Sequence, residues 1–371
     1  MRSREQGTMT TIAEIENHLA AFIAAGELDG AALSVAQRGR QVIGWQGGAA
    51  APGRPATART LWPLASISKS YSAAAIMALV ERGVLLLSTP VRALLPQFTG
   101  GGKEHATLRH LLTHTAGLIY ESPEMEQRMA VLTPAVDLVE EACRHDLLFA
   151  PGAGHAYADY GYLLAGEMAA RATGRPFAEL VRELVLKPAG LVDTHMPPTS
   201  EVYDQLAVVR GVLAEGSAGA MYNTPYALNL AHPAFGVVAS ADDLMRFGLN
   251  FAPTGPRFLS DAAVRAMTID QTGGRCLGWA PALGPQAAPA YPVAWGLGFY
   301  FQQAESPGVF GDLLSFDAYG HGGASGCQLV IDPKADLVIA LVTNCHARTG
   351  RERWSYRLRS TINRVAAMLT R

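Results

Sequence analysis

Residues 61–98 read LWPLASISKSYSAAAIMALVERGVLLLSTPVRALLPQF and contain the most informative pattern of the chain. The segment from Ala73 to Val80 is apolar on nearly every side, which is typical of a helix buried in a protein interior. We expect Ser66 in the first turn of this helix. Lys69 follows three positions later, so the two side chains lie on the same face, one turn apart.

Ser66 and Lys69 have the spacing of a nucleophile and its base. The N-terminus of a helix stabilises negative charge that develops on a serine oxygen. Burial disfavours charged lysine and lowers its pKa, which suits a base that takes the serine proton. The same short pattern also arises by chance, with the serine as an ordinary helix cap and the lysine on the surface. Taken alone, the pair leaves a catalytic and a structural interpretation open.

The N-terminal part of the chain predicts a helix followed by a hairpin. Thr11 and Glu14 form a capping-box pattern, and apolar residues follow at helical spacing to about residue 25. Two short apolar segments, Ala31–Ala36 and Gln41–Trp45, flank a turn that contains glycine, so we expect two antiparallel strands there.

The C-terminal part also predicts a hairpin and a helix. Cys327–Ile331 and Leu337–Val342 flank a turn that contains Asp and Pro, and a last amphipathic helix runs from Trp354 to Leu369. The middle, from about Leu61 to Leu191, has mostly helical patterns. The sequence therefore predicts an α/β (α+β) fold in which both termini build one antiparallel sheet flanked by helices, with a mostly helical domain inserted. We expect residues 1–60 and 235–371 to form the sheet domain and residues 61–234 the helical domain, with the active site at their interface.

Composition narrows the classes of function. The chain has 371 residues and a net charge of -2, without a basic run that would neutralise a phosphate backbone, so we expect no nucleic-acid partner. No apolar stretch is long enough to cross a membrane, and no apolar segment follows the charges at the N-terminus. We therefore expect a soluble, cytoplasmic protein that acts on a small molecule; the oligomeric state is not predicted.

The four cysteines and the closely spaced histidines do not indicate a metal site. The cysteines are scattered without a C-x-x-C pair, so we expect buried free thiols and neither zinc nor a disulfide framework. His110 and His114 have helical spacing, but a metalloprotease pattern needs Glu where Leu111 stands. We interpret both histidines as satisfied by local hydrogen bonds, and we expect no metal and no cofactor.

Four segments resemble the β-lactamase and penicillin-binding-protein superfamily, which includes class C β-lactamases, D,D-peptidases and family VIII carboxylesterases. They are, in order along the chain, residues 61–98, LRHLLTHTAGL at 108–118, PGAGHAYADYGYLLAG at 151–166 and YGHGGASG at 319–326. Residues 235–244 and 295–299 extend the likeness, which covers the chain from about Gly30 to Asn344. Four ordered segments at plausible spacing are a strong signal, where any one of them is only a hint.

The resemblance assigns roles to residues of this chain. Ser66 is implied to be the nucleophile, and Lys69 and Tyr157 the residues that activate it. Asp159 stands where the family has Asn in its Y-x-N motif. Because Asn donates a hydrogen bond to a substrate carbonyl whereas ionised Asp only accepts, Asp159 either borders the substrate or pairs with Lys69.

The glycine-rich segment at residues 319–326 falls where the family has its K-T-G or H-x-G strand. Small residues such as Gly322 and Gly323 let a substrate lie against the backbone of a strand beside the nucleophile. The resemblance implies an oxyanion hole formed by the backbone N–H groups of Ser66 and Ala324. His321 is expected to orient the tyrosine, to contact the leaving group, or merely to anchor the strand.

The implied activity is that of a serine hydrolase that forms an acyl-enzyme on Ser66. An α/β-hydrolase is set aside because the chain has no G-x-S-x-G elbow. Esters need less activation than amides, and an unexported enzyme does not reach periplasmic peptidoglycan, so we expect a carboxylesterase for short-chain or small-molecule esters. Three alternatives stay open: an amide-bond hydrolase (β-lactamase, D-amino-acid peptidase or oligoamide hydrolase), an acyltransferase, and a non-catalytic scaffold with the same fold.

Two routes for the serine proton also stay open. Either the lysinium charge lowers the tyrosine pKa and Tyr157 acts as the base, or neutral Lys69 acts directly. Three loops are expected to decide specificity: Ala252–Pro256, Trp279–Pro292 and Gln303–Phe316.

Overall fold

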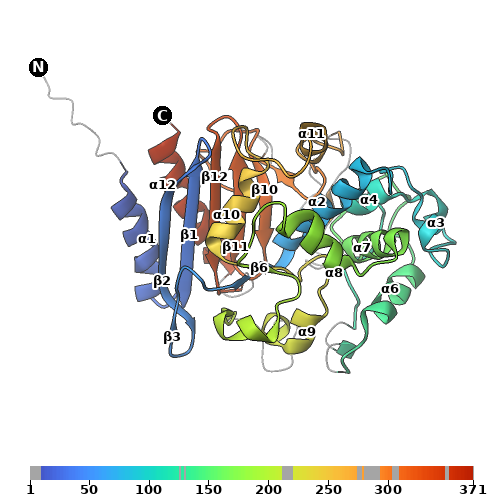
Figure 1. Ribbon diagram of the computed structural model, residues 1–371, viewed down its shortest axis with the longest axis horizontal. Coiled ribbons are helices and arrows are strands. Elements are labelled where there is room, and N and C mark those ends of the chain that lie inside the picture. Colours follow the sequence, from blue (N-terminus) through green and yellow to red (C-terminus); the bar gives the residue numbers. More distant parts are fainter. Residues whose placement is uncertain are drawn as a thin grey trace, which may run out of the picture.

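One seven-stranded antiparallel sheet, built from the two ends of the chain, organises the protein (Figure 1). The computed structural model describes residues 10–124, 127–128, 131–210, 220–273, 278–279, 293–302, 309–346 and 351–370. The strand order is β3-β2-β1-β12-β11-β10-β9. The strands are β1 (Gly30–Gln37), β2 (Arg40–Ala51), β3 (Arg54–Pro55), β9 (Tyr300–Phe301), β10 (Tyr319–Gly323), β11 (Cys327–Asp332) and β12 (Leu337–Thr343).

The two halves of the sheet meet where β1 pairs with β12. Leu33 lies opposite Leu341 and Val35 opposite Ile339 in this antiparallel ladder. The predicted fold class is therefore confirmed, because the first and last strands of the chain are direct neighbours. The strand β2 continues six residues beyond the predicted Trp45, through a glycine-rich and alanine-rich stretch that has little strand propensity of its own.

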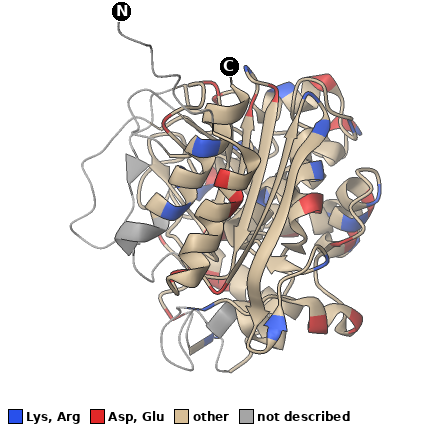
Figure 2. Cartoon of the chain, turned by 90° about the vertical axis from the view of Figure 1, so that its left-hand side faces the viewer, with Lys and Arg blue, Asp and Glu red and all other residues tan. Residues whose placement is uncertain are grey.

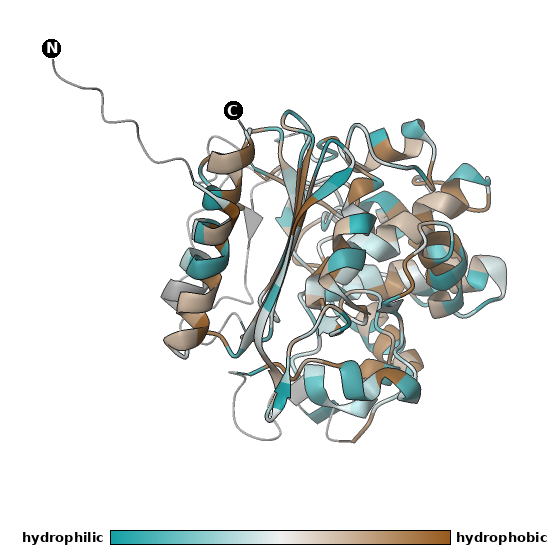
Figure 3. Ribbon diagram, turned by 60° about the vertical axis from the view of Figure 1, so that its left-hand side comes forward, coloured by the Kyte–Doolittle hydropathy of each residue, from teal (hydrophilic) through white to brown (hydrophobic). Residues whose placement is uncertain are grey.

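Helices cover both faces of the sheet, and the strand residues alternate accordingly (Figure 3). Leu33 and Val35 face the helices α1 (Ile12–Ala24) and α12 (Arg351–Leu369), whereas Ala32 and Ala36 face the larger helical part. On that second face α10 (Ala241–Leu249) packs closely, because a Cβ at Gly248 would lie 2.6 Å from Val338 Cγ1. The capping box predicted at Thr11 is present at the start of α1.

The helical part forms the other side of the molecule in Figure 1. Its central helix is α2 (Ser68–Glu81), in which every residue from Ser68 to Leu79 is buried. The prediction of a buried helix is confirmed. The elements around it are α3 (Val91–Leu94), α4 (Leu108–Leu112), α6 (Ala135–Arg144), α7 (Asp159–Thr173), α8 (Phe177–Val181), α9 (Pro225–Asn229) and α11 (Asp261–Met267), with short strands β4 (Trp62–Pro63), β5 (His155–Ala156), β6 (Thr194–His195), β7 (Val238–Ala239) and β8 (Gly278–Trp279).

The charged side chains and the cysteines are distributed as the sequence leads us to expect. Positive and negative side chains are interspersed over the face of the molecule shown in Figure 2. Cys143, Cys327 and Cys345 are buried free thiols, as expected, and Cys276 lies outside the described residues. Within the described ranges, no helix combines the length and the apolar character that a membrane crossing requires.

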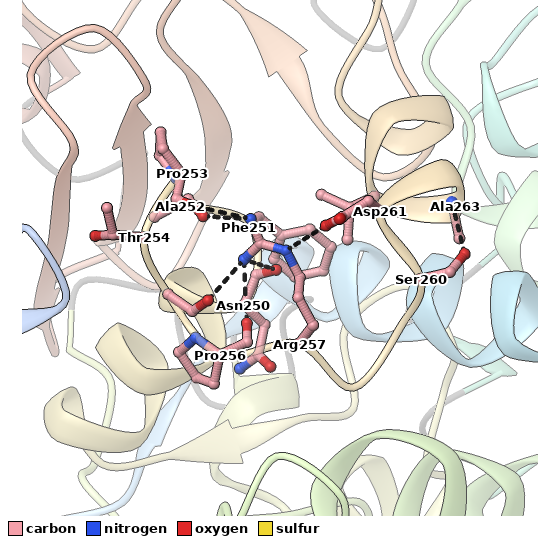
Figure 4. A network of polar contacts seen from close by, with 12 residues as sticks. Asn250, Phe251, Ala252, Pro253, Thr254, Pro256, Arg257, Ser260, Asp261 and Ala263 are labelled. Carbon is pink, nitrogen blue, oxygen red and sulfur yellow. Dashed lines mark hydrogen bonds and ion pairs between the residues drawn. The ribbon is translucent and has the colours of Figure 1, made fainter.

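Arg257 holds the loop at Ala252–Pro256 in place (Figure 4). Its guanidinium donates to the carbonyls of Asn250 and Ala252 at 3.0 and 2.6 Å, and Nε contacts Asp261 at 3.2 Å. These carbonyls follow the end of α10, where no further turn of helix satisfies them. One side chain therefore closes the α10 terminus and fixes the loop.

This loop lies near the end of β10 that is farther from the nucleophile segment, and its expected part in specificity stays a prediction. Thr254 donates a hydrogen bond to Asp336 in the β11–β12 turn. That turn adjoins the Tyr319 end of β10, because Tyr319 pairs with Ile331 next to it. Gly323, which reaches the nucleophile segment, is at the opposite end of the same strand.

We expect Arg257→Ala to lower the free energy of unfolding by about 1–3 kcal/mol, because several carbonyls lose a charged donor. The measurement is urea unfolding followed by circular dichroism, with Arg257→Lys as the matched control. Lysine keeps the charge but lacks the planar fork of donors, so it should recover only part of the loss. An unchanged unfolding midpoint for Arg257→Ala would show that the loop is held by other contacts.

Candidate active site

Ser66 lies in a 3-10 turn, Ala65–Ile67, directly before α2. The sequence predicts Ser66 in the first turn of the helix itself, but the helix begins only at Ser68. Ala65 has φ of +47°, a left-handed conformation that an L-residue adopts at a cost of about 1–3 kcal/mol. The strained turn presents Ser66 partly exposed between buried neighbours, Ala65 and Ile67. This exposure is what an attacking hydroxyl requires.

The amine of Lys69 is completely buried beside this hydroxyl. Lys69 Nζ lies 3.2 Å from Ser66 Oγ and 3.2 Å from the carbonyl oxygen of Ala234. Nζ also lies over the ring of Tyr157, 4.6 Å from its centroid. Burial lowers the pKa of Lys69, and the neighbouring carboxylate of Asp159 opposes that shift in part.

The carboxylate of Asp159 contacts the amine of Lys69, which is one of the two arrangements that the sequence left open. Its Oδ1 lies 2.6 Å from Lys69 Nζ, and the side chain is only 5% exposed. Asp159 is the first residue of α7, where the helix dipole favours a negative charge. Its backbone N–H donates to the carbonyl of Tyr120 at 2.7 Å, which fixes the start of the helix.

Tyr157 completes the contacts of the serine hydroxyl. The hydroxyl of Tyr157 interacts with that of Ser66. Burial, followed by the negative charge of Asp159, raises the pKa of Tyr157 well above its usual value. The phenol is therefore protonated at neutral pH, which speaks against the route in which a lysinium charge produces a tyrosinate base.

The segment 232–238 is tied to the first turns of α2 by side chains of that helix. Besides the bond from Lys69 to Ala234, the hydroxyl of Ser72 donates to the carbonyl of Pro233 at 2.7 Å. The N–H of Val237 donates to Ser68 Oγ at 2.9 Å. Sequence reasoning missed this role, although three polar side chains in an otherwise apolar buried helix are the signal that reveals it.

The strand β10 passes close to the nucleophile turn. A Cβ at Gly323 would lie 2.2 Å from the carbonyl oxygen of Leu64, so only glycine fits there. Beyond Gly320 the described residues provide no ladder partner on the β9 side. Gly322 and Ala324 are partly exposed, as Ser66 and Tyr157 are. This end of β10 therefore offers its backbone beside the serine, as the sequence predicts for the substrate strand.

The two backbone groups implied as an oxyanion hole belong to this edge. Ser66 and Ala324 each have an N–H group that donates to no other described residue. Both residues are partly exposed. Two free donors beside a nucleophile suit the negative oxygen of a tetrahedral intermediate.

His321 is buried and neutral. Its Nδ1 lies 2.8 Å from the carbonyl oxygen of Gly322, so Nδ1 carries the proton and Nε2 is left as an acceptor. Burial and the charge of Lys69 lower the pKa of His321 to about 3. The ring centroid lies 6.3 Å from that of Tyr157. His321 is thus a neutral neighbour of Tyr157, and which of its expected roles it fills stays a prediction.

A cluster of aromatic rings supports Tyr157 from behind. The ring of His114 packs 4.4 Å from that of Tyr157, centroid to centroid, and its Nδ1 accepts from the N–H of Ala158 at 3.0 Å. Trp295 contacts the same tyrosine edge to face at 5.7 Å. His110 accepts from the N–H of Thr107, which is the local hydrogen bond that we expected, whereas the bond of His114 joins it to a distant part of the chain.

The two remaining specificity loops are described only in part. Trp279, the first residue of Trp279–Pro292, pairs in β8 with Ala156, next to Tyr157. Residues 280–292 lie outside the described residues, as do 303–308 of the loop Gln303–Phe316. In the described part of that loop, Phe310 stacks on Tyr300 at 4.8 Å.

Known proteins match this sequence over most of its length. Residues 15–361 match the family described as Beta-lactamase. Esterase EstB of Burkholderia gladioli is 30% identical over 328 residues, 79% of each chain. Penicillin-binding protein 4 of Amycolatopsis lactamdurans is 27% identical and covers 78% of this chain and 73% of its own.

Solved structures share the fold. EstCE1, a hydrolase with promiscuous acyltransferase activity, superposes with a TM-score of 0.76 at 22% identity and covers 96% of this chain and 98% of its own. A family VIII carboxylesterase superposes with a TM-score of 0.72 at 23% identity and covers 95% and 98%. At these identities the likeness concerns the fold alone. The family match over nearly the whole chain and the relative with 30% identity are decisive: the chain belongs to the Beta-lactamase family.

Proposed function

We propose that this chain is a serine carboxylesterase that hydrolyses small-molecule esters through an acyl-enzyme on Ser66. The observation that carries the proposal is the partly exposed Ser66 hydroxyl, which contacts Lys69 Nζ at 3.2 Å and the Tyr157 hydroxyl. A nucleophile bonded to a base of lowered pKa is the arrangement that acyl transfer needs. The similarity to esterase EstB supports an ester as the substrate.

Neutral Lys69 is the base of acylation in this proposal. Ser66 Oγ attacks the ester carbonyl while its proton passes to Lys69 Nζ, and the carbonyl electron pair moves to the oxygen held by the N–H groups of Ser66 and Ala324. The intermediate then collapses with cleavage of the carbon–oxygen ester bond. Tyr157 gives its proton to the departing alkoxide and takes one back from the lysinium, so lysine and tyrosine both end neutral.

Deacylation uses the same groups in reverse. A water molecule attacks the acyl carbon and gives a proton to Lys69 through Tyr157. As the acyl–oxygen bond to Ser66 breaks, the lysinium returns that proton to Ser66 Oγ. The products are the free acid and the resting enzyme, and no group other than Ser66, Lys69 and Tyr157 changes its protonation.

An ester fits the site better than an amide. Asp159 replaces the donor amide that the family has at this position, and its carboxylate only accepts hydrogen bonds. An amide substrate therefore lacks one donor here, although it needs more activation than an ester does. The same residues also serve an acyltransferase, which differs in excluding water from the acyl-enzyme. The contacts of Ser66 with its base argue against a non-catalytic scaffold.

The proposal retains two expectations from the sequence. The site is placed between the sheet domain, residues 1–60 and 235–371, and the helical domain, residues 61–234. The protein is placed in the cytoplasm, where a small ester rather than peptidoglycan is its substrate.

We expect Ser66→Ala to abolish turnover of p-nitrophenyl butyrate and labelling by a fluorophosphonate probe, because no acyl-enzyme forms. Lys69→Ala and Tyr157→Phe should each lower kcat/KM by about 100-fold to 10,000-fold, the usual worth of a positioned acid or base. The exposed Ser88 gives the control, since Ser88→Ala should match the wild type. Ester turnover that survives Ser66→Ala would show that another residue is the nucleophile.

The choice between ester and amide is tested with one acyl group on two leaving groups. We expect kcat/KM for p-nitrophenyl butyrate to exceed that for the corresponding p-nitroanilide by more than about 100-fold, because the site lacks a donor for the harder reaction. A chromogenic cephalosporin serves as a second amide. Comparable values for ester and amide would give first place to amide hydrolysis, and butyryl transfer to added alcohol at the expense of hydrolysis would indicate an acyltransferase.

A further inference from the structure

Ser66, Lys69 and Asp159 form an unbroken chain of polar contacts. Ser66 Oγ lies 3.2 Å from Lys69 Nζ, and Nζ lies 2.6 Å from Asp159 Oδ1. The three residues come from three elements: the 3-10 turn, the first turn of α2 and the first turn of α7. The amine thus has the nucleophile on one side and a carboxylate on the other.

Among the residues that the structure describes, Asp159 has the carboxylate that contacts this amine directly. The titratable groups that face Lys69 are Asp159, Glu121, Tyr157, Tyr162, His114, His232 and His321. Burial keeps the histidines neutral and the tyrosines protonated, with pKa values of about 3 for His232 and His321. Glu121 raises the pKa of Lys69 less than Asp159 does.

A buried amine without compensation is a poor base. Lys69 has no exposed surface, so water does not solvate the lysinium that forms when the amine accepts a proton. An uncompensated charge in such a place is strongly disfavoured. The carbonyl of Ala234 at 3.2 Å offers a dipole but no charge. A carboxylate in contact is therefore the feature that makes proton transfer from Ser66 feasible.

We propose that Asp159 is the positioning residue of Lys69: its carboxylate holds the amine against Ser66 and stabilises the lysinium formed when the serine proton is taken. The inference rests on the proposed function, because it concerns the base of that reaction. The proton stays on Lys69 and is not passed on to Asp159, as in a Ser-His-Asp triad, until the leaving group receives one. The position that holds a neutral amide elsewhere in the family thus carries a charge that works on the base.

The replacement Asp159→Asn tests this role, because Asn preserves the shape and removes the charge. Only neutral Lys69 is active, so activity falls as pH falls through the lysine pKa. Loss of the carboxylate lowers that pKa, and we expect the acid limb of the kcat/KM profile for p-nitrophenyl butyrate to move down by about 1–3 pH units. The plateau at high pH should fall by roughly 10-fold, because a weaker base accepts the serine proton less well.

Glu121→Gln is the matched control. It also removes a carboxylate, but the charge of Glu121 raises the pKa of Lys69 less than that of Asp159 does. It should move the acid limb less than Asp159→Asn does and leave the plateau unchanged. Asp159→Ala is the second uncharged variant and should shift the limb in the same direction. Thermal unfolding shows that each variant is folded, and a variant that is not folded is replaced by the other.

The outcomes separate this inference from the proposed function. If Ser66→Ala keeps ester turnover, the nucleophile is wrong and the role of Asp159 falls with it. If Ser66→Ala is inactive but the acid limb of both Asp159 variants stays at the wild-type pH, Asp159 has a merely structural role and the inference alone is overturned. A limb that moves to higher pH overturns it too. A limb that moves down with a lower plateau establishes it.

Discussion

The rest of the site depends on the burial of one amine, that of Lys69, beside one hydroxyl. Lysine is almost never fully buried without a partner, because its charge loses the stabilisation that water gives. Here the fully buried amine contacts Ser66, Asp159 and the carbonyl of Ala234. Each partner comes from a different segment, so the three segments must pack correctly before the amine is satisfied. Correct packing of the helical part is therefore also a requirement for the chemistry of the serine.

The sheet serves this constraint by bringing β10 against the nucleophile turn. Gly323 can approach the carbonyl of Leu64 closely because it has no side chain. Ala65, the residue after Leu64, adopts a left-handed conformation. Such strain persists only where the surroundings over-determine the conformation. The β1–β12 pairing supplies that rigidity, since it fastens β10 and β11 to the N-terminal strands. The strained serine is therefore held by contacts between both ends of the chain.

The sequence predicts those parts of the structure that local pattern controls. Periodicity and turn residues predict the buried α2, the hairpins at both termini and the order of the site segments. The strand β2 is longer than predicted, because its glycines weaken the strand signal. Contacts between distant segments are different. Three such contacts join residues whose proximity no local pattern reveals. They are the bond from Lys69 to Ala234, the bond from Ala158 to His114 and the bonds from Arg257 to the Ala252–Pro256 loop. Such contacts arise from tertiary packing alone.

The Asp159 position shows why the site cannot be read from the family pattern alone. Replacing an amide by a carboxylate changes little in size, yet it exchanges a donor for a charge. In the interior that charge lies 2.6 Å from the lysine amine, so it changes the pKa values of neighbouring groups. The same negative charge contributes to raising the pKa of Tyr157, so it strengthens the lysine as a base while it keeps the tyrosine an acid. One buried carboxylate thus divides the acid and base roles between two neighbouring groups, which is how paired catalytic residues acquire distinct tasks.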